Sequence, residues 1–216
     1  METENFNFTA LKLCGVFAGV FALQIFTSFD PAFSASSSPW WKFFTSFFGH
    51  GDLEHLMNNL FFIGLFGSIY ERFTSSRIFL ATFLVSAVFA NLSAFIFFAE
   101  TSIIGASGGG MGLMAALAVF KPRKIGLAMG VPAPMWLVLA IYVLINVAGL
   151  SAVTGTAYEA HLMGLLSGGL IGLQLRELES DRKHSGKKKS GVRKQEKAED
   201  DWSKRIREWE EKWMMK

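Results

Sequence analysis

The sequence predicts an all-α polytopic membrane protein with six transmembrane helices. Hydrophobic residues make up 51% of the 216 residues, the chain contains 22 Phe, and its mean hydropathy is +0.33. These values exceed what a soluble domain of this length needs for its core. Six apolar runs can serve as spans: Leu11–Phe29, Leu53–Tyr70, Ile78–Ala99, Gly108–Phe120, Ala133–Val153 and Ala157–Leu175. Six spans place both termini on one side of the membrane.

The charges between the runs alternate as this topology requires. The second and fourth connections and the tail are basic, whereas the third and fifth connections contain only acidic charges: Arg72, Arg77, Lys121, Arg123 and Lys124 against Glu100 and Glu159. Because short cytoplasmic loops are rich in Lys and Arg, both termini are predicted to be cytoplasmic. The longest connection, Asp30 to about Asp52, then lies outside, where Trp40-Trp41 suits an interfacial anchor. The protein is predicted to reside in the plasma or inner membrane.

The two ends of the chain differ in character from the helical part. Residues 1–10 form a short N-terminus whose Glu2 and Glu4 do not fit a signal peptide, so residues 11–175 are taken as one retained six-helix domain. Residues 1–175 carry 7 Lys/Arg and 8 Asp/Glu, and residues 176–216 carry 14 and 10. The tail is therefore a solvated unit, and its mixed signs argue against nucleic-acid binding. The single cysteine, Cys14, excludes an intrachain disulfide.

The tail itself has two predicted parts. Residues 176–200 are rich in Lys, Ser and Glu and read as a disordered basic linker. Within residues 201–216, four apolar residues recur at helical spacing: Trp202, Ile206, Trp209 and Trp213. This stripe predicts a short amphipathic helix, which would lie on the inner membrane surface or pair with another chain.

Three polar side chains from three runs share one depth in the membrane. We estimate depth from the first cytoplasmic charge of each run, at a helical rise of about 1.5 Å per residue. Asn59 lies roughly 20 Å from Arg72, Ser107 roughly 21 Å from Lys121, and His161 roughly 22 Å from Arg176. In a hydrocarbon core about 30 Å thick, this level is about 10 Å below the outer surface. His55 lies one turn further out on the same face as Asn59. Such residues usually face a bundle interior or a wet cavity, so this level is the candidate reaction site.

The fourth run explains how Ser107 becomes reachable. Its apolar residues from Gly108 to Phe120 cover only about 20 Å, so Thr101–Ala106 are expected to enter the membrane as a loop. Gly105 permits a backbone conformation that a residue with Cβ resists. Ser107 then opens the helix, whose N-terminal N–H groups suit an oxyanion.

His161 is the candidate base for Ser107, because it is the histidine expected at the same depth on another helix. Both helices carry small residues that allow close packing: Gly108 and Gly112 on one, and Gly164, Gly168 and Gly172 on the other. An alternative interpretation is that the small residues form only a packing face and that His161 is a structural histidine. The shared depth of Ser107, His161 and Asn59 favours catalysis instead. We expect His50 to be interfacial and Asn146 to be structural.

Three separated motifs within roughly residues 10–175 resemble the rhomboid intramembrane serine proteases. They are the turn Gly105-Ala106-Ser107-Gly108, the pair Ala160-His161 followed by Gly164, and the segment from His50 through His55 to Asn59. The resemblance implies a six-helix rhomboid-like bundle, a Ser107–His161 dyad without an aspartate, and an oxyanion hole from His55, Asn59 and the Ser107 N–H. It also implies that water enters from outside and that single-span membrane proteins are cut near their outer end. No metal and no cofactor is expected, and membrane lipid is the surrounding solvent.

The chain departs from the family pattern at two places. Met111 stands where the family commonly has an aromatic residue stacked on the catalytic histidine, and methionine orients that ring less firmly. Trp41-Lys42 replaces a frequent Trp-Arg pair, and Glu71 occupies a position that is acidic in the family. Lys lacks the bidentate fork of Arg, which weakens the case for an ion pair in that loop.

The predicted function is that of an intramembrane serine endopeptidase. A catalytically silent relative that binds and escorts transmembrane helices is the main alternative, against which the presence of both Ser107 and His161 argues. A small transporter would require an inverted repeat, for which the sequence offers no internal symmetry. Without a third group to hold the imidazole tautomer, the dyad is expected to be slower than a full triad.

Overall fold

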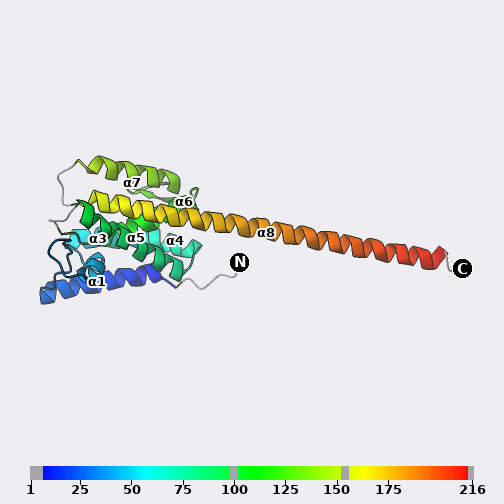
Figure 1. Cartoon of the computed structure of the whole chain (residues 1–216), viewed down its shortest axis with the longest axis horizontal. Helices are drawn as coiled ribbons and strands as arrows, with labels where there is room; N and C mark the ends of the chain where they lie inside the picture. The colour runs from blue at the N-terminus through cyan, green and yellow to red at the C-terminus, as the bar shows by residue number, and fades with distance from the viewer. Residues whose placement is uncertain (1–6, 98–101, 152–155, 214–216) are drawn as a thin grey trace. The chain divides into compact units, whose positions relative to one another are not determined.

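The computed structural model describes residues 7–97, 102–151 and 156–213 (Figure 1). It divides into two compact units, Met1–Gln174 and Leu175–Lys216, and each is described by itself. Several expectations lie outside the described residues: those for residues 1–6, the end of the third run at Ala99, Glu100, Thr101, the end of the fifth run at Val153, and residues 214–216 of the terminal helix.

The described residues are mostly helical. In chain order the elements are α1 (Thr9–Thr27), α2 (Lys42–Thr45), the 3-10 turn η1 (Ser46–Phe48), α3 (Leu53–Phe62), the π-helical turn η2 (Ile63–Gly67), α4 (Ser68–Phe73), α5 (Ser76–Phe97), α6 (Ser107–Phe120), the strands β1 (Ile125–Ala128) and β2 (Val131–Pro134), α7 (Met135–Gly149) and α8 (Tyr158–Trp213). Among the described helices, α1 and α5 are by themselves long and apolar enough to cross a membrane. Helices α6 and α7 are apolar but shorter, and α6 begins at Ser107 as predicted.

Helix α6 is the centre of the first unit. Every residue from Gly108 to Ala118 is buried, which the run of Gly and Ala permits because small residues let neighbouring backbones approach. On one side, a Cβ added at Gly109 would collide with the ring of Phe83 on α5. On the other, Cβ atoms on three α8 glycines would collide with α6 backbone: Gly164 with Gly108, Gly168 with Gly112, and Gly172 with Ala116. The two helices therefore touch backbone to backbone.

The outer helices expose far more apolar surface than a soluble protein does. Helix α1 buries one stripe, Ala10, Leu13 and Phe17, and leaves large side chains such as Phe26 and Ile25 exposed. Helix α7, which lies on the opposite side of the unit from α1 in Figure 1, is likewise apolar and largely exposed. A helix that is apolar on every side while exposed is suited to lipid.

A short β-hairpin between α6 and α7 corrects the all-α prediction. Strands β1 and β2 pair antiparallel, with Ala128 opposite Val131. The two residues between them, Met129 and Gly130, both have positive φ, at 50° and 85°. This is the conformation that a tight two-residue hairpin requires. The fifth helix therefore begins at Met135 rather than at Ala133, because hydropathy does not distinguish an apolar strand from an apolar helix end.

The second unit also differs from expectation. Residues 176–200, predicted as a disordered basic linker, are helical within α8. Lys, Arg, Glu and Gln are good helix formers, so a segment that cannot build a core can still be helical. Trp202 and Ile206 are both exposed in this helix, and the membrane-surface role of the tail stays a prediction.

Glu71, in α4, connects the start of α1 to the start of α5 by hydrogen bonds. Its Oε1 accepts hydrogen bonds from the Thr9 N–H at 3.0 Å and the Ser76 hydroxyl at 2.9 Å, and its Oε2 accepts the Ala10 N–H at 3.1 Å. It therefore pairs N–H groups that the first turn of a helix leaves open. Burial raises the pKa of Glu71, but the hydrogen bonds from Thr9, Ala10 and Ser76 outweigh it and leave that pKa below its usual value.

Replacing Glu71 with glutamine is expected to destabilise the protein at pH 7 by about 1.5–3 kcal/mol, the range for hydrogen bonds to a charged group. Because the folded pKa is lowered, this contribution is present above the unfolded pKa of about 4.3 and is lost as pH falls through the lower folded value. Melting temperatures in detergent at pH 7 and at low pH measure the difference, which should shrink with acid. The exposed Glu177 provides the control Glu177→Gln, and an equal shift in both variants would contradict the prediction.

Lys42 forms an ion pair within its own connection, where its Nζ lies 3.3 Å from Asp30 Oδ2. Glu71 is engaged with α1 and α5. The Ala32 N–H, together with Lys42, holds the pKa of Asp30 below its usual range. As expected for lysine, the pair is a single contact, and Asp30 is largely exposed, so its contribution to stability is small.

Candidate active site

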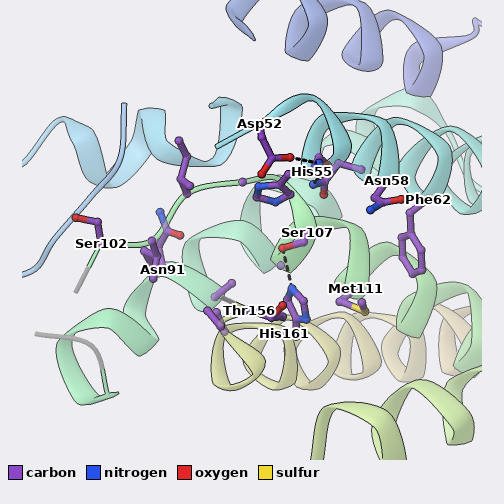
Figure 2. A pocket seen from close by; sticks show the side chains of 18 of the residues that line it. Asp52, His55, Asn58, Phe62, Asn91, Ser102, Ser107, Met111, Thr156 and His161 are labelled. Atoms are coloured by element: carbon purple, nitrogen blue, oxygen red, sulfur yellow. Dashed lines mark hydrogen bonds between the residues drawn. The ribbon is translucent and has the colours of Figure 1, made fainter. Parts of the chain in front are cut away.

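Ser107 and His161 face each other at the ends of two helices. The Ser107 hydroxyl lies 2.8 Å from His161 Nε2, as the dashed line in Figure 2 shows. Ser107 is the first residue of α6, and His161 lies in the first turn of α8. The contact joins residues 54 positions apart and depends on the close packing of α6 against α8. This is the geometry of a serine nucleophile and its general base.

The pair lies in a pocket of about 530 Å³. Helix α3 supplies His55, Asn58, Asn59 and Phe62, the loop before α6 supplies Gly105, and Met111 follows Ser107 on α6. Figure 2 shows His55 and His161 on opposite sides of Ser107. Both predicted oxyanion side chains, His55 and Asn59, therefore line the same cavity as the serine.

The side of the pocket predicted to hold the oxyanion offers hydrogen-bond donors. Asn59 uses one amide proton to bind the His55 carbonyl at 2.8 Å, which leaves its second amide proton to offer to a ligand. The first helical hydrogen bond of α6 runs from the Gly110 N–H to the Ala106 carbonyl at 3.0 Å. The N–H groups that precede it, that of Ser107 among them, stand at the positive end of the helix. These donors are suited to a developing negative charge.

The connection between α1 and α3 holds the loop that carries Ser107. The Gly105 N–H donates to the Ser46 carbonyl at 3.0 Å, and the Asn91 side chain donates to the Ser46 hydroxyl at 2.7 Å. Phe33 and Ile103 exchange two backbone hydrogen bonds, at 3.0 and 2.8 Å. The loop is thus fixed by main-chain contacts, which explains how a non-helical segment is tolerated here.

The sequence profile of the Rhomboid domain matches residues 37–178, most of the chain and all of the pocket. The chain belongs to the rhomboid family. Rhomboids are a family of intramembrane serine proteases, and this chain is accordingly an integral membrane protein. Rhomboid-like protein 11, chloroplastic, of Arabidopsis thaliana is 32% identical to it over 83 residues. That match covers 38% of this chain and 30% of the relative's length.

Gly105 has a conformation and a contact that only glycine fits in this rhomboid. Its φ is 119°, and an added Cβ would lie 2.6 Å from the His55 ring. Gly105→Ala is expected to lower the rate of the predicted cleavage about 100-fold, because it displaces His55, the predicted oxyanion donor, and the serine turn together. Gly130 is the matched control: its φ is also positive, at 85°, but a Cβ there meets nothing. Gly130→Ala should cleave normally, and equal losses in both variants would refute this role for Gly105.

His50, for which a position at the membrane interface stays a prediction, is buried within the rhomboid domain. Only 1% of it is exposed, and its ring packs edge-on against His55 and Phe17 with centroids 5.2 and 5.7 Å away. The cause is Gln24, whose side-chain amide bonds both the N–H and the carbonyl of His50, each at 3.0 Å. These bonds hold the end of the connection between α1 and α3 in place, with the His50 ring against His55, the predicted oxyanion histidine.

The contact between Asn146 and His161 was not predicted from the sequence. Asn146 Oδ1 lies 2.8 Å from His161 Nδ1, although a purely structural role was expected for Asn146. A buried polar residue in the very apolar helix α7 was the available indication. An aromatic ring also contacts His161: Tyr158 lies edge-on to it at 6.3 Å, while Met111 lines the pocket nearby.

Across residues 7–97, 102–151 and 156–213, no group of three His, Cys, Asp or Glu side chains is placed to hold a metal ion.

Proposed function

We propose that this rhomboid is a serine endopeptidase that cleaves transmembrane-helix substrates near the outer face of the bilayer. The observation that carries the proposal is the 2.8 Å contact between Ser107 Oγ and His161 Nε2, within a pocket at the N-terminus of α6. Family membership supports the reaction class, and transmembrane substrates are general to the family.

The proposed mechanism follows from this contact. A substrate helix unwinds locally and presents a carbonyl to Ser107, whose hydroxyl proton passes to His161 Nε2. The new C–O bond forms a tetrahedral oxyanion, which accepts hydrogen bonds from His55, Asn59 and the Ser107 N–H. His161 returns its proton to the leaving amine as the C–N bond breaks. In the second step His161 takes a proton from water, which attacks the acyl-enzyme, and returns it to the Ser107 oxygen as the ester bond breaks.

The proposed topology has six spans with both termini cytoplasmic, in the plasma or inner membrane. The first two spans are α1 and the stretch from α3 to Tyr70 in α4. The other four are α5, α6, α7 and the first part of α8. The exposed Trp40 on the outer connection suits an interfacial position, and the basic residues Lys121 and Arg123 follow α6 at the other end. Ser107, at the other end of α6 from these charges, would then lie toward the outside, where water and the outer end of a substrate helix are available.

A fluorophosphonate probe tests the proposal, because it reacts only with an activated serine. The purified wild-type protein in detergent should be labelled, and Ser107→Ala and His161→Ala should both lose the label. Ser151, an exposed serine beyond α7, provides the control Ser151→Ala, which should label like wild type. A folded wild type that takes no label would instead favour the silent protein that binds and escorts transmembrane helices.

A further inference from the structure

The side of His161 that faces away from Ser107 is not left to solvent. Its Nδ1 lies 2.8 Å from Asn146 Oδ1, and only 1% of Asn146 is exposed. Asn146 comes from α7, a helix whose buried residues within the described chain are otherwise Met135, Val138 and Gly149. A polar residue at a buried position of an apolar helix is costly unless its groups are paired, and both polar atoms of this amide are paired.

The second contact of Asn146 determines which way its amide faces. Its Nδ2 donates to the Tyr142 carbonyl at 2.7 Å, one turn earlier on the same helix. A carbonyl can only accept, so the nitrogen must face Tyr142 and the oxygen must face His161. The oxygen in turn can only accept, so His161 must donate from Nδ1. Nε2 is then the unprotonated nitrogen, and it is the nitrogen that lies 2.8 Å from the Ser107 hydroxyl.

The packing around this contact supports the same arrangement. Asn146 and Gly149 are three residues apart on one face of α7, and Tyr158 and His161 are three apart on one face of α8. A Cβ added at Gly149 would collide with the Tyr158 ring, so the two helices are close at this level. Tyr158 in turn lies edge-on to His161. The imidazole is therefore held by a hydrogen bond to Asn146 and by a ring contact with Tyr158.

We propose that Asn146 is a positioning residue that holds His161 in the Nδ1–H tautomer, so that the site works as a Ser107–His161–Asn146 triad rather than as a dyad. This inference rests on the proposed function. It also accounts for Met111, because the hydrogen bond supplies the orientation that a stacked aromatic ring would otherwise give. Unlike an aspartate, the amide adds no negative charge to the site, so it fixes the tautomer without strongly stabilising the imidazolium.

The test compares Asn146→Leu, which has no acceptor, with Asn146→Asp, which keeps one. In cleavage of a single-span substrate, Asn146→Leu is expected to lower kcat on the order of 30-fold with KM changed less than about twofold. Asn146→Asp should recover kcat to within about threefold of wild type. Thr82→Val serves as the control for lost stability, since it removes a buried hydrogen bond to Tyr70 outside the pocket. It should lower the melting temperature without this change in kcat.

Two results would overturn the proposal. One is a folded Asn146→Leu that retains wild-type kcat, and the other is a loss of kcat that Asn146→Asp does not reduce. If Asn146→Leu fails to fold, nitrogen NMR of the wild-type His161 ring decides the matter. A single Nδ1–H tautomer supports the inference, and a mixture of tautomers overturns it. The same spectrum decides it if the wild type proves inactive, a result that would count against the proposed protease and not against the tautomer.

Discussion

His161→Ala is expected to lower the rate of substrate cleavage on the order of 10⁴-fold, the upper range for loss of a general base. Ser107 is a weak nucleophile on its own, and Nε2 of His161, at 2.8 Å, is the group that contacts its hydroxyl. The fall should appear in kcat, because the imidazole acts on proton transfer in the transition state and not on binding of the substrate helix. Cleavage of a reconstituted single-span substrate in liposomes provides the measurement.

The double variant sharpens this first prediction. Residues that act as one unit are strongly non-additive, so Ser107→Ala with His161→Ala should be no slower than Ser107→Ala alone. Both proteins should remain in the membrane fraction, because neither side chain is part of the apolar surface that the helices present to lipid. Full cleavage by folded His161→Ala would end the assignment of His161 as the base.

The second large effect is expected at Gly168. A Cβ there would collide with the backbone of Gly112 on α6, and a backbone atom cannot rotate away as a side chain can. Gly168→Ala should therefore separate α6 from α8 and destabilise the protein by about 3 kcal/mol, at the upper end for overpacking. Because the same helix pair brings His161 to Ser107, activity should fall with stability.

The neighbouring Gly169 provides a matched control. It lies in the same helix, but a Cβ there meets nothing within 4 Å. Alanine is the better helix former, so Gly169→Ala is expected to be neutral or to stabilise by up to about 1 kcal/mol. Thermal unfolding of both variants in one detergent measures the contrast. Equal melting temperatures would show that α6 and α8 do not pack backbone to backbone.

The parts of the site that sequence reasoning located have a common origin. Ser107, His161 and Asn59 stood out because polar residues in apolar runs are rare, and a fixed rise per residue converts position into depth. The glycines of α6 and α8 stood out because their spacing repeats with the helix. Both arguments need only one helix at a time, and the structure places these residues around one pocket and along one helix contact.

The features that the sequence did not reveal had two origins: a distant partner in one case and an ambiguous local signal in the other. His50 is buried because Gln24 binds its backbone from α1, which no local pattern near His50 reveals. The hairpin at β1 and β2 was hidden because an apolar strand and an apolar helix end have the same hydropathy.

By itself, the sequence determined the class of the protein: an apolar, helical, membrane-embedded rhomboid with a serine at a helix start and a histidine at matching depth. It could do so because hydropathy, helical rise and small-residue spacing are local properties. Only the tertiary structure decided which groups meet. Asn146 and His161 are 15 residues apart on two helices, and their contact at 2.8 Å depends on how α7 packs against α8. The orientation of a side-chain amide and the tautomer of an imidazole are properties of that contact and not of either segment alone.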